Sequence, residues 1–220
     1  MPGPTSLPLL AERQDELTKC AYCPKLCRAT CVVSEALPRE ALIPGSKMKS
    51  AFEAVRDGSL DAEQAEQAWG CSNCFRCREA CDHRNPVTET LNDARADYVA
   101  QGLAPGAVQA VLDRQEALEV EHSAAVAALA ETPGVRADAE TALLLGCRYA
   151  RTFPEEARAA IRLAVALAGP VRLIDACCGA WQRSAGAPAA AVAARARVTS
   201  LVAGQRLLVS DPRCALELRD

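Results

Sequence analysis

The chain has 220 residues; half are hydrophobic and only 4% are aromatic, so a core must be built mainly from Ala, Leu and Val. Such a composition is typical of helix-rich proteins. The formal net charge is −3 with both signs interspersed, which gives no reason to expect nucleic acid as a partner. The length allows one large domain or two small ones.

Twelve cysteines are the strongest compositional feature, and their meaning depends on the redox compartment. Residues 1–10 contain three prolines and no positive charge, so they do not resemble a secretory signal. No run of about 18 apolar residues predicts a transmembrane helix. We therefore expect a reducing cytoplasm, where clustered cysteines indicate metal or redox chemistry more than disulfides.

Two cysteine motifs follow an N-terminal segment, residues 1–14, that we expect to be disordered or loosely ordered. The first has the spacing C-x2-C-x3-C-x3-C and consists of Cys20, Cys23, Cys27 and Cys31. The second has the spacing C-x2-C-x2-C-x3-C and consists of Cys71, Cys74, Cys77 and Cys81. The second spacing is the ligand run of bacterial-type [4Fe-4S] ferredoxins, and the first differs from it by one extra residue.

The fourth cysteine of each run binds the other cluster in two-cluster ferredoxins. This crossing predicts that cluster 1 is held by Cys20, Cys23, Cys27 and Cys81, and cluster 2 by Cys31, Cys71, Cys74 and Cys77. Proline commonly follows the fourth cysteine of such runs, whereas Val32 and Asp82 follow here. Since eight cysteines suffice for two clusters, we expect His83 and His122 to be solvent-exposed.

Structural zinc sites are the alternative, because C-x2-C pairs are also a zinc signature and each set supplies four thiolates. Zinc sites usually place two ligand pairs about a dozen or more residues apart, whereas each motif here is compact. Two [4Fe-4S] clusters are therefore our prediction, and a zinc-stabilised interaction module without redox activity is the alternative.

Basic residues flank both motifs, namely Lys19, Lys25, Arg28, Arg76, Arg78 and Arg84. Positive charge favours the more negative, reduced form of a cluster, so these side chains are expected to raise its potential. An ordinary solvated face is the alternative interpretation.

Helical patterns surround the motifs. A helix that starts near Ser46 is expected to end at Gly58. An Asp and a Gln three residues apart form a capping box that opens a helix over 62–69, and a further helix is predicted over 86–100. We assign residues 15–103 to an α-helical ferredoxin-type domain with two [4Fe-4S] clusters.

The rest of the chain changes character. Residues 104–137 have Pro-Gly pairs near both ends and apolar residues at helical spacing, so we predict a helical connector. In residues 138–220, short apolar runs alternate with helices in a βαβαβ pattern, which implies a small α/β domain with a parallel sheet. The expected strands are 143–145, 171–174 and 207–209, and the expected helices are 154–168 and 188–202.

Four cysteines lie where these strands end, namely Cys147, Cys177, Cys178 and Cys214. Open parallel sheets usually place their sites at this edge. Gly179, directly after the vicinal pair, would let backbone and inorganic sulfur approach closely.

From about Leu17 to Leu218 the chain resembles the iron–sulfur subunits of the heterodisulfide-reductase and glycolate-oxidase type. That family includes the iron–sulfur subunit of anaerobic glycerol-3-phosphate dehydrogenase and the lactate-utilisation proteins. The resemblance rests on C-C-G at 177–179, L-L-L-G-C at 143–147, S-D-P-R-C at 210–214, and the second motif followed by a helix carrying Ala94-Arg95. It implies a two-cluster ferredoxin domain joined to a cysteine-rich CCG domain, and a flavin-containing or other oxidoreductase subunit as partner.

The chain departs from the family at Asp211, which stands where the closing pair has its first cysteine. In the heterodisulfide-reductase relatives, a full set of five cysteines is associated with a noncubane [4Fe-4S] cluster that acts on disulfides. One hypothesis is a third iron–sulfur cluster on Cys147, Cys177, Cys178 and Cys214 with Asp211 as an oxygen ligand. The other is a cluster-free domain that docks a partner.

No nucleotide-binding or hydrolase signature occurs: the chain has no G-x-G-x-x-G, no P-loop and no G-x-S-x-G. A flavin or nicotinamide site would therefore belong to another subunit. We expect a cytoplasmic, non-catalytic electron-transfer subunit that meets a membrane only through its partner. A disulfide-reducing subunit with a noncubane cluster is the second alternative.

Overall fold

The structure, a computed structural model, describes residues 6–24 and 26–219. They divide into two compact units. Unit 1 runs to Ala110 and includes the short segment Arg183–Ala187, and unit 2 holds the rest. The boundary falls inside helix α8 (Gly106–Asp113). Within the described residues, none of the helices combines the length and the apolar character that crossing a membrane requires.

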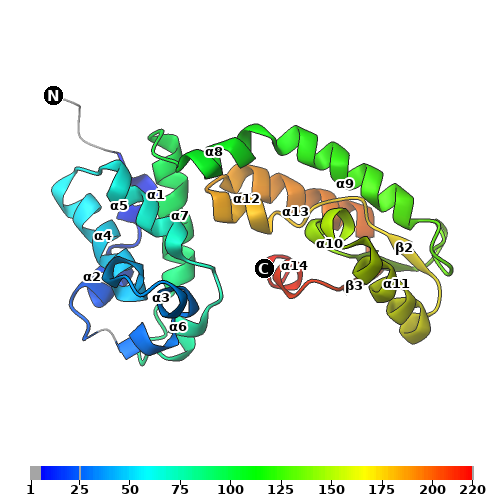
Figure 1. Ribbon diagram of the computed structural model, residues 1–220, viewed down its shortest axis with the longest axis horizontal. Coiled ribbons are helices and arrows are strands. Elements are labelled where there is room, and N and C mark those ends of the chain that lie inside the picture. The colour runs from blue at the N-terminus through cyan, green and yellow to red at the C-terminus, as the bar shows by residue number, and fades with distance from the viewer. Residues whose placement is uncertain (1–5, 25, 220) are drawn as a thin grey trace. The chain divides into compact units, whose positions relative to one another are not determined.

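The described part of unit 1 is built of helices (Figure 1). Its α-helices are α1 (Pro8–Ala11), α2 (Gln14–Ala21), α3 (Val32–Ala36), α4 (Pro44–Asp57), α5 (Ala62–Glu66), α6 (Arg76–Glu79) and α7 (Val87–Ala100). Three 3₁₀ helices lie between them, η1 (Leu26–Thr30), η2 (Glu40–Leu42) and η3 (Gln67–Gly70). The predicted helical character of this part of the chain is confirmed.

Local signals set the ends of these helices. Gly58 follows α4 with φ +63°, a left-handed conformation that favours glycine. Asp61 and Gln64 form the predicted capping box, in which each side chain accepts a hydrogen bond from the other residue's backbone N–H. The helix that begins there tightens after Glu66 and continues as η3, so the predicted single helix has two parts.

The N-terminal segment differs from its prediction. Residues 1–5 lie outside the described residues, but Leu7 and Leu10 are buried in the core of unit 1. The carboxylate of Asp97 on α7 accepts hydrogen bonds from the backbone N–H groups of Leu9, at 3.4 Å, and Leu10, at 2.9 Å. Apolar burial and these two bonds hold the segment in place, which the prolines alone did not indicate.

Unit 2 contains a three-stranded sheet in the order β2-β1-β3, with both pairs parallel. The strands are β1 (Thr141–Leu144), β2 (Val171–Leu173) and β3 (Arg206–Val209). The helices of this part of the chain are α9 (Gln115–Leu129), α10 (Cys147–Thr152), α11 (Pro154–Ala168), α12 (Ala180–Ala185), α13 (Pro188–Val202) and α14 (Pro212–Glu217). The predicted parallel sheet is confirmed.

The sheet separates two apolar clusters, because neighbouring residues of a strand face opposite sides. Leu143 belongs to the cluster formed with α9, α10 and α11, and Leu144 to the cluster that contains Val198 of α13 and Cys214 of α14. Val126 is among the buried residues that α9 contributes. This helix, predicted as part of a connector over 104–137, is therefore a layer of unit 2.

Candidate functional site

A pocket of about 130 Å³ in unit 1, here called the Cys20 pocket, gathers thiols from both cysteine motifs. The cysteines that line it are Cys20, Cys23, Cys27, Cys77 and Cys81. The first three come from α2, the segment after it and η1, whereas Cys77 lies on α6 and Cys81 two residues after its end. The four cysteines predicted for cluster 1 are therefore brought together.

A second and smaller pocket of about 20 Å³, the Cys71 pocket, is lined by Cys31, Cys71, Cys74 and Cys77. These are the four cysteines predicted for cluster 2. Cys77 lines both pockets, so the two thiol sets are adjacent. Within the described part of the chain, no three His, Cys, Asp or Glu side chains are arranged to hold a single metal ion.

The loop that carries the second motif has an unusual backbone. Asn73 and Phe75 both have positive φ, 56° and 60°. These two left-handed residues, on either side of Cys74, curl the chain, so that cysteines three positions apart can face one pocket. The side chain of Asn73 is buried, and its backbone N–H donates to Cys71 Sγ at 3.4 Å.

Burial controls the protonation of two thiols. Burial raises the pKa of Cys20 to about 11, although a hydrogen bond from Asn85 Nδ2 at 2.9 Å acts in the opposite direction. Burial also raises the pKa of Cys77 to about 12. Metal ligation requires the thiolate, so binding a metal centre here would release these protons. Several thiols that converge on one pocket are the donor set that such a centre uses once they are deprotonated.

Cys31 has a different environment. Although burial acts to raise its pKa, hydrogen bonds from Ser34 and the positive charge of Lys47 lower it. Lys47 lies on α4 with only 2% of its surface exposed. Its Nζ donates to the Gly70 carbonyl at 2.6 Å and lies 4.0 Å from Cys31 Sγ. A cation is therefore buried beside a thiol of the Cys71 pocket.

A second buried cation, Arg95 on α7, holds the start of the Cys71 loop. Its guanidinium donates to the carbonyl oxygen of Ala68 at 2.8 Å, to that of Cys71 at 2.7 Å and to Asn73 Oδ1 at 3.2 Å. Arg95 as a whole is 1% exposed. These bonds fix the backbone within η3 and directly after it, where the loop begins.

The basic residues near the motifs are largely paired on the surface. Arg28 bonds Glu40, Arg78 bonds Glu89, and Arg84 bonds Glu79. Lys25 lies outside the described residues. Exposed pairs are screened by water, so they have little influence on a buried site. The sequence interpretation missed Lys47; the signal was its i, i+3, i+7 spacing with Ser50 and Ala54 along one helical stripe.

The four cysteines of the C-terminal part form two pairs. Cys147 Sγ lies 3.9 Å from Cys177 Sγ, and Cys178 Sγ lies 3.0 Å from Cys214 Sγ. Asp211 Oδ1 accepts from the backbone N–H groups of Arg213, at 2.7 Å, and Cys214, at 3.4 Å. The carboxylate predicted as an oxygen ligand therefore caps the N-terminus of α14.

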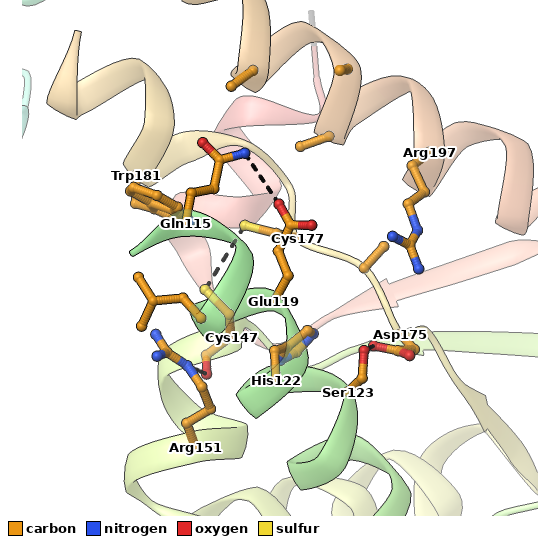
Figure 2. A pocket seen from close by; sticks show the side chains of 15 residues that line it. Gln115, Glu119, His122, Ser123, Cys147, Arg151, Asp175, Cys177, Trp181 and Arg197 are labelled. Carbon is orange, nitrogen blue, oxygen red and sulfur yellow. Dashed lines mark hydrogen bonds between the residues drawn. The ribbon is translucent and has the colours of Figure 1, made fainter. Parts of the chain in front are cut away.

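The Cys147–Cys177 pair faces a pocket of about 240 Å³ in unit 2 (Figure 2). Figure 2 shows the two sulfurs side by side, with Arg151 and His122 nearby. His122 was expected to be exposed, but it is 6% exposed and neither ring nitrogen has a hydrogen-bond partner within the described residues. Burial lowers its pKa, although Asp175 and the backbone of Ala176 act in the opposite direction. The prediction failed because helical periodicity does not say which face a second layer covers. His83 is exposed, as predicted.

Comparison with known families agrees with the cysteine pattern. Residues 16–85 match the family model described as a 4Fe-4S dicluster domain, and this segment contains both motifs. No curated protein and no solved structure matched the chain. Residues 16–85 therefore form an iron–sulfur domain of the ferredoxin type.

Proposed function

We propose that the chain is an electron-transfer subunit that holds two [4Fe-4S] clusters and relays single electrons to or from a partner oxidoreductase. The ligands of cluster 1 are Cys20, Cys23, Cys27 and Cys81, and those of cluster 2 are Cys31, Cys71, Cys74 and Cys77. One observation carries the proposal: the last cysteine of each motif lines the pocket of the other motif. That exchange is the ligand pattern of two-cluster ferredoxins.

The chain's own residues suit this role. When bound, such clusters supply one-electron chemistry, while the protein sets their potential and exposure. Cys77 lies between the two pockets, which keeps the two sites close. Cys74 is exposed, so the Cys71 pocket has a ligand at the molecular surface, where a redox partner can approach.

The partner is proposed to be a flavin-containing or other oxidoreductase subunit in a reducing cytoplasm. The chain lacks the glycine-rich fingerprint of flavin and nicotinamide sites. Unit 2 is proposed to have no third cluster, because Asp211 caps α14 and the remaining thiols contact one another in pairs. This favours a relay over a disulfide-reducing subunit.

Metal analysis of anaerobically purified protein tests the cofactor. We expect a brown protein with about eight irons and eight acid-labile sulfides per chain, four for each cluster. About twelve irons would contradict the cluster-free unit 2. Colourless protein rich in zinc would contradict the proposed function and favour the interaction module.

Single cysteine substitutions test the crossed ligand sets. Cys81→Ser should alter the electron-paramagnetic signal of the cluster that Cys23→Ser also alters, although Cys81 belongs to the second motif. Cys31→Ser should likewise alter the signal of the cluster that Cys74→Ser alters, although Cys31 belongs to the first motif. Cys214→Ser is the matched control and should leave both signals unchanged. If Cys81→Ser instead reproduced Cys74→Ser, the crossed assignment would be wrong.

A further inference from the structure

Lys47 is a buried cation without an acidic partner. Its Nζ donates to the Gly70 carbonyl, and its other polar neighbour is the sulfur of Cys31 at 4.0 Å. No carboxylate of the described residues forms an ion pair with it. Burying an ammonium group is unfavourable unless negative charge or strong hydrogen bonds compensate it. The described residues supply one carbonyl and one thiol.

The position of Lys47 is built into the fold. A Cβ on Gly70 would lie 2.6 Å from Leu42 Cδ2 and 3.5 Å from Lys47 Cε. The glycine therefore leaves the space that the side chains of Leu42 and Lys47 occupy. With α4 on one side and η3 on the other, the ammonium group is held close to the Cys71 pocket, which Lys47 itself lines.

Among the described residues, the Cys20 pocket has no comparable buried charge. Its basic lining residues are Lys19 and His83, and both are exposed to solvent. The buried donor to its thiols is Asn85, a neutral amide. Water screens exposed charges, whereas a buried charge acts through a medium of low dielectric constant. The two cysteine sites therefore differ in electrostatics. Two buried cations, Lys47 and Arg95, lie at the Cys71 loop, and of these Lys47 lines the Cys71 pocket and has its charge beside a thiol.

We infer that Lys47 compensates the negative charge of cluster 2 and makes it the more easily reduced of the two clusters. This inference rests on the proposed function. Reduction adds one negative charge to a thiolate-ligated cluster, and the fixed cation favours that form. Lys47 is not a ligand; it acts through its charge beside Cys31.

Redox titration of the anaerobic protein, followed by electron-paramagnetic resonance, tests the inference. Lys47→Met keeps the side-chain length and removes the charge. We expect at least a tenfold shift of one cluster's reduction equilibrium towards the oxidised form, which is a fall of 59 mV for a one-electron couple. Lys47→Arg should restore most of the difference.

Lys49→Met is the matched control. Lys49 lies on the same helix, but its side chain is half exposed and lies 3.6 Å from Glu53. This variant should leave both potentials unchanged. Equal potentials in Lys47→Met and Lys49→Met, with both clusters present, would overturn the inference and leave the proposed function intact.

A second measurement does not depend on how Lys47→Met folds. In the otherwise unaltered protein, Cys74→Ser should remove or shift the signal that is reduced at the higher potential, and Cys23→Ser the one reduced at the lower potential. The opposite assignment would overturn the inference alone. Iron and sulfide contents showing that the unaltered protein holds neither cluster would overturn the proposed function and this inference together.

Discussion

Replacing Arg95 by Met should destabilise unit 1 strongly. The arginine is 1% exposed, and its guanidinium donates hydrogen bonds to the carbonyl oxygens of Ala68 and Cys71 and to the side chain of Asn73. Methionine has a similar length but no donor, so the substitution leaves these three acceptors without this partner, together with the partly buried side chain of Asn92 and carbonyl oxygen of Ser184. The defect lies where the loop of the second motif begins.

The magnitude follows from the number of acceptors. Each buried group left without a hydrogen bond costs roughly 1–3 kcal/mol. The guanidinium no longer has to be desolvated, which offsets part of the total, so we expect a loss of about 3–5 kcal/mol in the free energy of unfolding. For a unit of this size, about 3 kcal/mol lowers the midpoint of thermal unfolding by at least roughly 12 °C.

Tryptophan fluorescence can follow unit 1 by itself. The chain has two tryptophans, Trp69 in unit 1 and Trp181 in unit 2, so a Trp181→Phe background reports on unit 1 alone. Arg56→Met is the control, because Arg56 is exposed and its replacement should change stability by no more than about 0.5 kcal/mol. A fall of under about 4 °C for Arg95→Met would refute the reasoning.

Two further predictions concern unit 2. Gly179 has φ +94°, and an added Cβ would lie 2.5 Å from the Ala191 carbonyl oxygen, so Gly179→Ala should cost at least about 2 kcal/mol in a thermal scan followed at Trp181. Gly204→Ala, with φ +80° and open space, should cost about 1 kcal/mol; equal losses would contradict the steric argument. The pKa of His122 is lowered on folding, so below about pH 6.5 the unfolded chain takes up a proton that the native protein does not. The free energy of unfolding should therefore fall as the pH decreases from about 6.5. Urea unfolding at pH 7.5 and pH 5.5 measures this fall, which should be smaller for His122→Gln than for the unaltered protein. An equal fall in the two proteins would contradict the prediction.

Local signals in the sequence were sufficient to predict most helices and strands. The helix ended by Gly58, the capping box at Asp61 and the parallel strands are set by interactions within a few residues or by apolar periodicity. The spacing of the cysteines also identified the iron–sulfur segment, since the residues that wrap one cluster are close in the chain.

Long-range packing decided what these signals left open. The docking of Leu10 against α7 and the burial of His122 by the layers of unit 2 depend on residues distant in sequence. The same holds for Lys47, which the sequence presents as one of several basic residues. The use of Asp211 as a helix cap is different, because it depends on the local backbone at the start of α14.

The sequence by itself determined the two cysteine motifs, the helical first part and the parallel sheet, because periodicity and ligand spacing are local properties. Only the tertiary structure decided which thiols share a pocket and which cation is buried beside them. Burial changes the energy of a charge far more than it changes that of an apolar group, and it depends on the elements that close over it. Lys47 therefore acquires its electrostatic role when α4 and η3 come together.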